Sequence, residues 1–223
     1  MKTRLLRLSV ACLTLLTLSI ISPCSGTVVT FDDLSETGSG AWFSFQYQGY
    51  QGLIWNNIQC FNAILYTNVL AQMHPNFTNG LTGDYYGMVS ASNVVRLVGI
   101  PSSVPNSEID SPGTNFNFFS AYLTGEFNSN LNIEVQGFSG TDLLYDQTVV
   151  ASATNATLFT FNYLGIDRLY FASFGGQPAF GLDAPGGIVM DDFSFEFVPE
   201  PSTVLLAALG ALTLCAFLKR KPG

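Results

Sequence analysis

Positively charged residues are almost missing from the middle of this 223-residue chain. Six of the eight lysines and arginines lie in the first seven or the last five residues, which leaves only Arg96 and Arg168 between them. All sixteen acidic residues lie between Asp32 and Glu200, so this part carries a net charge of −14 with its histidine neutral. A body this acidic repels phosphate backbones, which excludes nucleic-acid binding.

Histidine is equally scarce. His74 is the only one and lies in a turn-like Met-His-Pro-Asn context. A Ser-His-Asp triad would depend on it, and a histidine-rich zinc site is impossible. No nucleophile-elbow, phosphate-loop or dinucleotide-binding motif occurs. We therefore expect the chain not to be an enzyme, and the alternative is a glycosidase built from two of the sixteen acids.

Cysteine is nearly absent from the body. Cys12, Cys24 and Cys215 lie in the terminal segments, which leaves Cys60 alone between them. A disulfide within the mature body is therefore excluded. We expect Cys60 to be a small buried apolar residue rather than a reactive thiol.

The first 26 residues have the pattern of a secretory signal peptide. Three basic residues precede an apolar run from Leu8 to Ile21, and small residues with a proline follow before Gly26. The apolar run is short for a membrane span of about 20 residues. The pattern therefore predicts export, with cleavage after Gly26.

The C-terminus combines prolines, an apolar run and a basic tail. Pro199, Glu200 and Pro201 precede sixteen uncharged residues, 203–218, and three basic residues follow at 219–221. The prolines end the preceding strand, and the apolar run is expected to form a transmembrane helix of about 24 Å. The basic tail is expected to stay in the cytoplasm.

This arrangement resembles the PEP-CTERM sorting signal of bacterial exported proteins over residues 198–221. The resemblance implies an exosortase-type processing enzyme as partner, which cuts near Pro199-Glu200-Pro201. It also implies a precursor held transiently in the inner membrane and a mature form at the cell surface or outside the cell. It says nothing about the activity of the body, residues 27–197.

The body has the pattern of an all-β domain. Polar and apolar residues alternate along three segments, 115–118, 130–136 and 192–197. Further strand candidates are 27–34, 53–59, 86–91, 94–99, 142–150, 157–163 and 167–174. Turn-forming clusters separate them, and no helical periodicity stands out between the terminal segments. The sequence predicts a jelly-roll-like β-sandwich of two antiparallel sheets with a phenylalanine-rich core.

The first and last strand candidates resemble the paired terminal strands of jelly-roll carbohydrate-binding modules and of other PEP-CTERM passengers. The opening segment is 28–34 and the closing segment is 188–195; each contains an Asp-Asp pair. The resemblance implies a sandwich whose two ends pair.

Aromatic residues gather between positions 41 and 57, where glutamine, asparagine and glycine separate them. Sugar rings stack on aromatic faces, and amides bond their hydroxyl groups. Trp42, Tyr47, Tyr50 and Trp55 are therefore candidate contacts for extracellular polysaccharide. The alternative is that both tryptophans pack in the core.

The terminal strand candidates also suggest a structural calcium ion. Asp33 and Asp191 share strand faces with apolar residues, where an ionised carboxylate needs a partner. Because the body has only two arginines, Ca²⁺ is a natural counter-charge. Asp32 and Asp192 take these places if the register slips by one.

Two functions follow from these observations. The first is a non-enzymatic cell-surface or extracellular-matrix protein processed by an exosortase-type system. The alternative is a carbohydrate-binding module that acts on extracellular polysaccharide.

Overall fold

The computed structural model describes residues 26–34, 42–45, 48–73, 81–97, 107–181, 186–199 and 207–214. The chain separates into two units, the body Gly26–Val198 and a unit made of both ends. In the C-terminal part, residues 207–214 are helical, inside the predicted helix 203–218. Among the described residues no helix has both the length and the apolar character needed to cross a membrane. The predicted signal peptide lies outside the described residues, except for Gly26.

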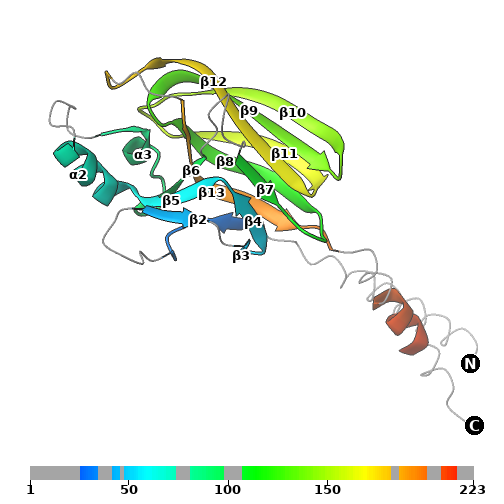
Figure 1. The fold of residues 1–223 in the computed structure, drawn as a ribbon. Helices are drawn as coiled ribbons and strands as arrows, with labels where there is room; N and C mark the ends of the chain where they lie inside the picture. Colours follow the sequence, from blue (N-terminus) through cyan, green and yellow to red (C-terminus); the bar gives the residue numbers. More distant parts are fainter. Residues whose placement is uncertain are drawn as a thin grey trace, which may run out of the picture. The chain divides into compact units, whose positions relative to one another are not determined.

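The body is a sandwich of two antiparallel sheets (Figure 1). The seven-stranded sheet has the order β11-β8-β13-β6-β5-β2, and β1 also pairs with β13. Its strands are β1 Thr27–Val29, β2 Trp42–Phe45, β5 Ile58–Asn62, β6 Asn93–Leu97, β8 Phe116–Gly125, β11 Thr157–Ile166 and β13 Ile188–Phe197. This arrangement confirms the predicted β-sandwich and the predicted pairing of the first and last strands.

The six-stranded sheet has the order β10-β9-β12-β7-β4-β3. Its strands are β3 Gln48–Tyr50, β4 Leu53–Asn56, β7 Ser107–Asp110, β9 Asn128–Ser139, β10 Asp142–Ala151 and β12 Arg168–Pro178. Along β9 and β12, buried and half-buried residues alternate, as expected for strands with one face on the core. The half-buried residues therefore form the outer face of this sheet.

Phenylalanines fill the space between the sheets, as the composition predicts. Phe118 stacks on Phe193 with ring centroids 4.9 Å apart, and Phe116 meets Phe195 edge to face. Cys60 is also fully buried in this core, which confirms its predicted apolar role, and burial raises the pKa of its thiol. The hydrophobic core that holds the two sheets together therefore combines residues from the middle and the end of the chain.

Two helices differ from the all-β prediction. Helix α2 spans Ala63–Met73 and helix α3 spans Gly83–Tyr86, both beside β5 and β6 in Figure 1. The strand predicted at 86–91 is wrong, because residues 87–92 form turns and bends after α3. The side chains of Tyr66 and Leu70 on α2 pack against Phe61 of β5, so this helix covers part of the seven-stranded sheet.

Two residues with a left-handed backbone conformation explain why two of the strands are shorter than predicted. The strand predicted at 27–34 stops at Val29 because Phe31 has a φ of 62°. The segment predicted as one strand, 53–59, is broken at Asn57, whose φ is 54°. At this break the chain passes from the six-stranded sheet to the seven-stranded sheet, and asparagine tolerates that conformation better than most residues.

Candidate functional site

The aromatic segment predicted to contact polysaccharide contributes to the core instead. Trp55 is 1% exposed and meets Phe31 and Phe193 edge to face, each at 5.4 Å between ring centroids. Its Nε1 donates a hydrogen bond to the backbone oxygen of Tyr50, 3.0 Å away. The prediction that Trp55 is a ligand contact is therefore corrected. Its position on β4 points it between the sheets.

Of the other three aromatic candidates, the structure describes the side chain of Tyr50 alone. The half-buried Tyr50 packs against the same core and donates a hydrogen bond to Asp33 Oδ1 at 2.6 Å. The side chain of Trp42 and all of Tyr47 lie outside the described residues. The structure therefore does not bring these four residues together as one exposed surface.

The candidate calcium ligand Asp191 is fully buried on β13 and meets hydrogen-bond donors there. Its carboxylate accepts from the backbone N–H groups of Val89, Ser90 and Asp192 and from the Ser90 hydroxyl, at 2.8–3.1 Å. Burial raises the pKa of Asp191, and these hydrogen bonds oppose the rise. Segment 89–90 therefore supplies the partner that a buried carboxylate needs.

Asp32 has a similar role one strand away. Its carboxylate accepts from the backbone N–H groups of Ala91 and Asn93 at 3.1 and 3.3 Å. These hydrogen bonds outweigh the effect of burial and lower its pKa. Asp191 thus binds segment 89–93 to β13, and Asp32 binds it to the turn that follows β1. Among the described residues no group of three His, Cys, Asp or Glu is arranged to hold a metal, and the calcium ion at Asp33 and Asp191 stays a prediction.

A buried ion-pair cluster lies under the helices, on the face of the seven-stranded sheet that points away from the core. The Arg96 guanidinium is 2.9 Å from Asp84 Oδ2 and 2.7 Å from Glu126 Oε1. It also lies over the rings of Phe61 and Tyr66, at 4.3 and 5.1 Å from their centroids. Burial raises the pKa of Glu126 to about 8, although Arg96 lowers it. This Arg96 cluster joins α2, α3 and the β8–β9 turn to β6.

The outer face of the six-stranded sheet carries a mixture of aromatic, amide and acidic side chains, and we call it the β12 face. Strand register places Tyr170 opposite Glu108 on β7 and Gln136 on β9. Phe174, four residues further along β12, lies opposite Asn132. The outward residues of this face are Ile54, Asn56, Glu108, Asp110, Asn132, Glu134, Gln136, Phe138, Asp146, Thr148, Val150, Arg168, Tyr170, Ala172 and Phe174.

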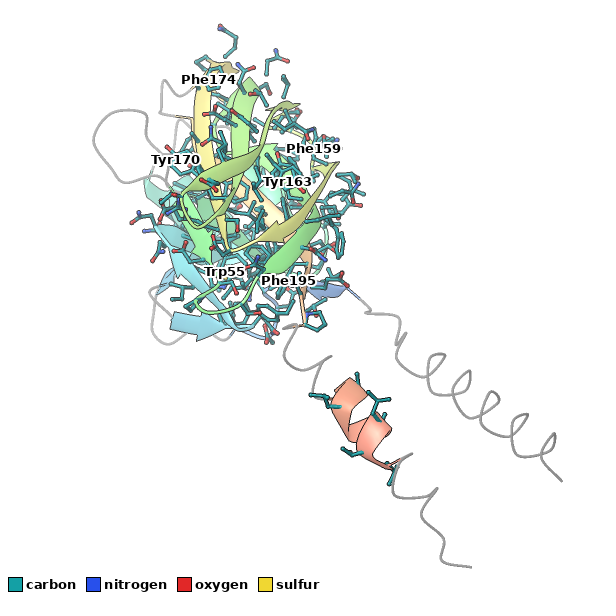
Figure 2. All side chains as sticks on the ribbon, turned by 90° about the vertical axis from the view of Figure 1, so that its right-hand side faces the viewer. Trp55, Phe159, Tyr163, Tyr170, Phe174 and Phe195 are labelled. Atoms are coloured by element: carbon teal, nitrogen blue, oxygen red, sulfur yellow. The ribbon has the colours of Figure 1, made fainter. Side chains whose placement is uncertain are left out.

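The aromatic residues of the β12 face are accessible from outside. Phe174 is 49% exposed and Tyr170 is half-buried. Figure 2 shows both labelled on the same side of the body, away from Phe159 and Tyr163 of β11, which pack in or against the core. Because Tyr170 and Phe174 are four residues apart on a regular strand, they lie about 13 Å apart along it. The face therefore offers two separate ring surfaces on a single line.

Amide side chains on this face are already oriented by neighbouring acids. The Gln136 amide donates to Glu134 Oε1 and to Asp146 Oδ2, both at 3.3 Å. The Asn56 amide donates to Asp110 Oδ2 at 2.6 Å. These hydrogen bonds hold polar groups on both sides of the aromatic line.

Negative charge dominates the electrostatics of the β12 face. Burial raises the pKa of Tyr170, and the nearby carboxylates of Glu134 and Glu108 raise it further. The pKa of Asp110 is also raised, by burial and by the charge of Glu108, although Arg168 opposes this. The face therefore lies in a field that repels anions and attracts cations.

The sequence analysis missed this face, although one signal for it exists. Within the predicted strand 167–174, Arg168, Tyr170, Ala172 and Phe174 alternate with Leu169, Phe171 and Ser173, which are buried. This alternation identifies the outward residues once the core side is known. Aromatic residues occur on both sides of the strand, so composition alone does not distinguish the two faces.

The body ends directly before the proline motif. The backbone N–H of Val198 donates to the Asn115 carbonyl at 2.8 Å, and the Thr114 hydroxyl donates to the Val198 carbonyl at 3.4 Å. Pro199 follows at once, whereas Glu200 and Pro201 lie outside the described residues. Residues 197–221 match the family model of the PEP-CTERM protein-sorting motif. The chain carries this sorting motif at its C-terminus.

The PEP-CTERM motif identifies the route of the protein. Proteins with this motif are exported and sorted to the cell surface, and the motif implies processing by an exosortase. The matched residues begin at Phe197, the last residue of β13, so the motif adjoins the folded body without an intervening domain. No curated protein matches the sequence.

Solved structures with a similar arrangement are distant. A DUF4465 family protein from Bacteroides ovatus is 11% identical, with a TM-score of 0.40 over 77% of this chain and 94% of that one. The tandem CBM22 domains of Xyn10C from Paenibacillus barcinonensis are 13% identical, with a TM-score of 0.40 over 80% of this chain and 49% of that one. TmCBM61, solved with β-1,4-galactotriose, is 10% identical, with a TM-score of 0.31 over 66% of this chain and 87% of that one. These likenesses are too weak to assign a ligand or an activity.

Proposed function

We propose that the mature body is a non-enzymatic cell-surface or extracellular-matrix protein with a jelly-roll-like sandwich that holds polysaccharide on its β12 face. The PEP-CTERM motif supports the location, because proteins with this motif are exported and sorted to the cell surface. The β12 face supports the binding activity.

The observation that carries the proposal is the line formed by Tyr170 and Phe174 on the outer side of β12. The apolar faces of sugar rings stack on aromatic side chains, and neighbouring amides and carboxylates bond the hydroxyl groups. Gln136 and Asn132 flank the two rings on β9, and Glu108 flanks Tyr170 on β7. An extended chain of sugars laid along β12 would meet both kinds of contact.

The buried pair Asp84 and Glu126 is unsuited to a glycosidase role. Asp84 and Glu126 both bind Arg96 and are 0% and 4% exposed, respectively. A glycosidase needs its two carboxylates on opposite sides of a bound glycosidic bond. An arginine between two buried acids stabilises the packing of α2 and α3 and leaves neither acid placed against a substrate.

Affinity gel electrophoresis of the exported protein against a panel of extracellular polysaccharides tests the proposal. Tyr170→Ala and Phe174→Ala should each weaken retention about fivefold to thirteenfold, from the loss of about 40–60 Å² of ring contact at about 25 cal/mol per Å². Tyr122→Ala is the matched control, because Tyr122 is a half-buried tyrosine on the outer face of the other sheet, opposite Leu158. Tyr170→Leu keeps an apolar side chain but removes the aromatic ring, so it should weaken retention as much as Tyr170→Ala does.

Two results would contradict the proposal. The first is that no polysaccharide in the panel retards the wild-type protein. The second is that Tyr122→Ala weakens retention as much as Tyr170→Ala does, since that would place the contact elsewhere.

A further inference from the structure

We propose that the β12 face prefers a polysaccharide that carries free amino groups over neutral or acidic polysaccharides. This inference rests on the proposed function, because it concerns the ligand class of the same surface. It follows from the charges that surround the aromatic line.

Four carboxylates lie on the β12 face. Glu108 is the direct cross-strand neighbour of Tyr170, and Asp146 lies in the same row beyond Gln136. Glu134 lies in the next row along β9, opposite Ala172, and Asp110 is the cross-strand neighbour of Arg168. A ring stacked on Tyr170 is therefore bordered by acidic residues on both sides.

Arg168 is the one cation among the outward residues of the β12 face, and it is already engaged. Its guanidinium lies over the Phe138 ring at 4.7 Å from the centroid and donates to the Gly140 carbonyl at 3.4 Å. It lies in the row of Ile54 and Asp110, one row away from Tyr170. Two of the acids beside Tyr170, Glu134 and Asp146, accept hydrogen bonds from the Gln136 amide. None of the acids beside Tyr170 forms an ion pair with a cation among the described residues of this face.

A ligand ammonium group suits this arrangement better than other sugar substituents. An ammonium group carries three N–H donors and a positive charge, so it can bond Glu108 or Glu134 while its ring stacks on Tyr170. An N-acetyl group offers one N–H without charge, and a uronate adds a further negative charge to the face. The order of binding should therefore be amino-bearing, then N-acetylated, then uronate polymer.

Partly de-acetylated chitosan, the same chitosan after re-acetylation, and polygalacturonate provide three probes with different charge. Retention of the exported protein is measured on gels that contain each polymer, at pH 5.5 and at low and high salt. Chitosan should retain the wild-type protein most strongly, and added salt should reduce that preference because it screens charge. Polygalacturonate should retain it least.

Single isosteric variants test which acids set the preference. Glu108→Gln and Glu134→Gln should each weaken retention by chitosan about twofold to fivefold more than retention by the re-acetylated polymer, because glutamine still bonds hydroxyl groups but carries no charge. Glu196→Gln is the matched control, because it makes the same change in net charge on β13, in the other sheet, where Asn117 donates to Glu196.

The outcomes separate this inference from the proposed function. If the re-acetylated polymer binds in a Tyr170-dependent way but chitosan binds no better, the preference for amino groups is wrong and the polysaccharide site stands. If polylysine binds as tightly as chitosan and Tyr170→Ala changes neither, the face is a general binding surface for polycations and the inference is overturned. If none of the three polymers is retained, the preference is wrong, and the wider polysaccharide panel then decides the proposed function.

Discussion

Replacing Arg96 by methionine should remove the positive charge that balances the two buried acids of the Arg96 cluster, Asp84 and Glu126. Arg96 contacts Asp84 and Glu126 at 2.9 and 2.7 Å and covers the ring of Phe61. Removing one partner of a buried ion pair costs about 3–5 kcal/mol, because the remaining charge has lost its solvent and its partner. Methionine keeps most of the side-chain volume, so the loss at neutral pH reports mainly on charge.

The pH dependence distinguishes this mechanism from loss of packing. The pKa of Glu126 is raised to about 8 in the folded protein, above its ordinary value of 4.5. Between these values the folded state binds a proton that the unfolded state releases, so the contribution of Glu126 to stability falls as pH rises. The steepest slope from one such group is about 1.4 kcal/mol per pH unit.

Arg96→Met should extend this dependence to higher pH, because the attraction that lowers the pKa of Glu126 is lost and its pKa rises further. Urea unfolding of the exported protein at several pH values from 6 to 9.5 measures it. The difference from wild type should grow as the pH rises through about 8, where Glu126 ionises beside Arg96 in the wild type but has no counter-charge in the variant. The triple variant Arg96→Met with Asp84→Asn and Glu126→Gln should recover most of the loss.

The half-exposed Arg168 provides the control. Arg168→Met removes a cation from the surface of the six-stranded sheet and should cost no more than about 1 kcal/mol at any of these pH values. A loss for Arg96→Met that is equal at pH 6 and pH 9.5 would refute the electrostatic mechanism. So would a triple variant no more stable than the single one.

Three further predictions test other parts of the structure. Trp55→Ala should lower the free energy of unfolding by about 3–5 kcal/mol in urea titrations, because the indole is buried among Phe31, Phe193 and Tyr50. An unfolding midpoint close to that of the wild type would contradict the burial of Trp55. If a calcium ion binds at Asp33 and Asp191, millimolar Ca²⁺ should raise the melting temperature of the exported protein, whereas equal melting in excess chelator would exclude the ion. Mass spectrometry of the exported protein should find no peptide beyond about Ser202, and an intact C-terminus would contradict processing at the PEP-CTERM motif.

The periodicity of the sequence predicted the longer strands of the sandwich, because each has one face on a single core, but not the short strands β2, β3 and β7. The segment 130–136 became β9 and the segment 192–197 became the end of β13, both with alternating burial. The helices were harder to predict, because α2 packs against a sheet through few residues and carries apolar side chains on several sides. Ile64 and Leu65 are 49% and 43% exposed, although neither is polar.

The candidate site depended on long-range pairing that composition does not contain. The densest aromatic segment placed Trp55 in the core, whereas the accessible Tyr170 and Phe174 come from a less conspicuous strand. The buried Asp191 carboxylate does have a partner, as predicted, but that partner is a set of backbone amides about 100 residues away in sequence. Such amides leave no compositional signal, in contrast to a charged or metal-binding partner.

Amide chemical-shift mapping tests the central claim most directly. The ¹⁵N-labelled exported protein is titrated with the polysaccharide that retains it most strongly on gels. Shifts should be concentrated on β12 and β9, around Tyr170, Phe174 and Gln136, and should be absent from the outer face of β8 and β11 around Tyr122 and Leu158. Shifts concentrated at the β8 and β11 face, with β12 unaffected, would contradict a polysaccharide site on the β12 face.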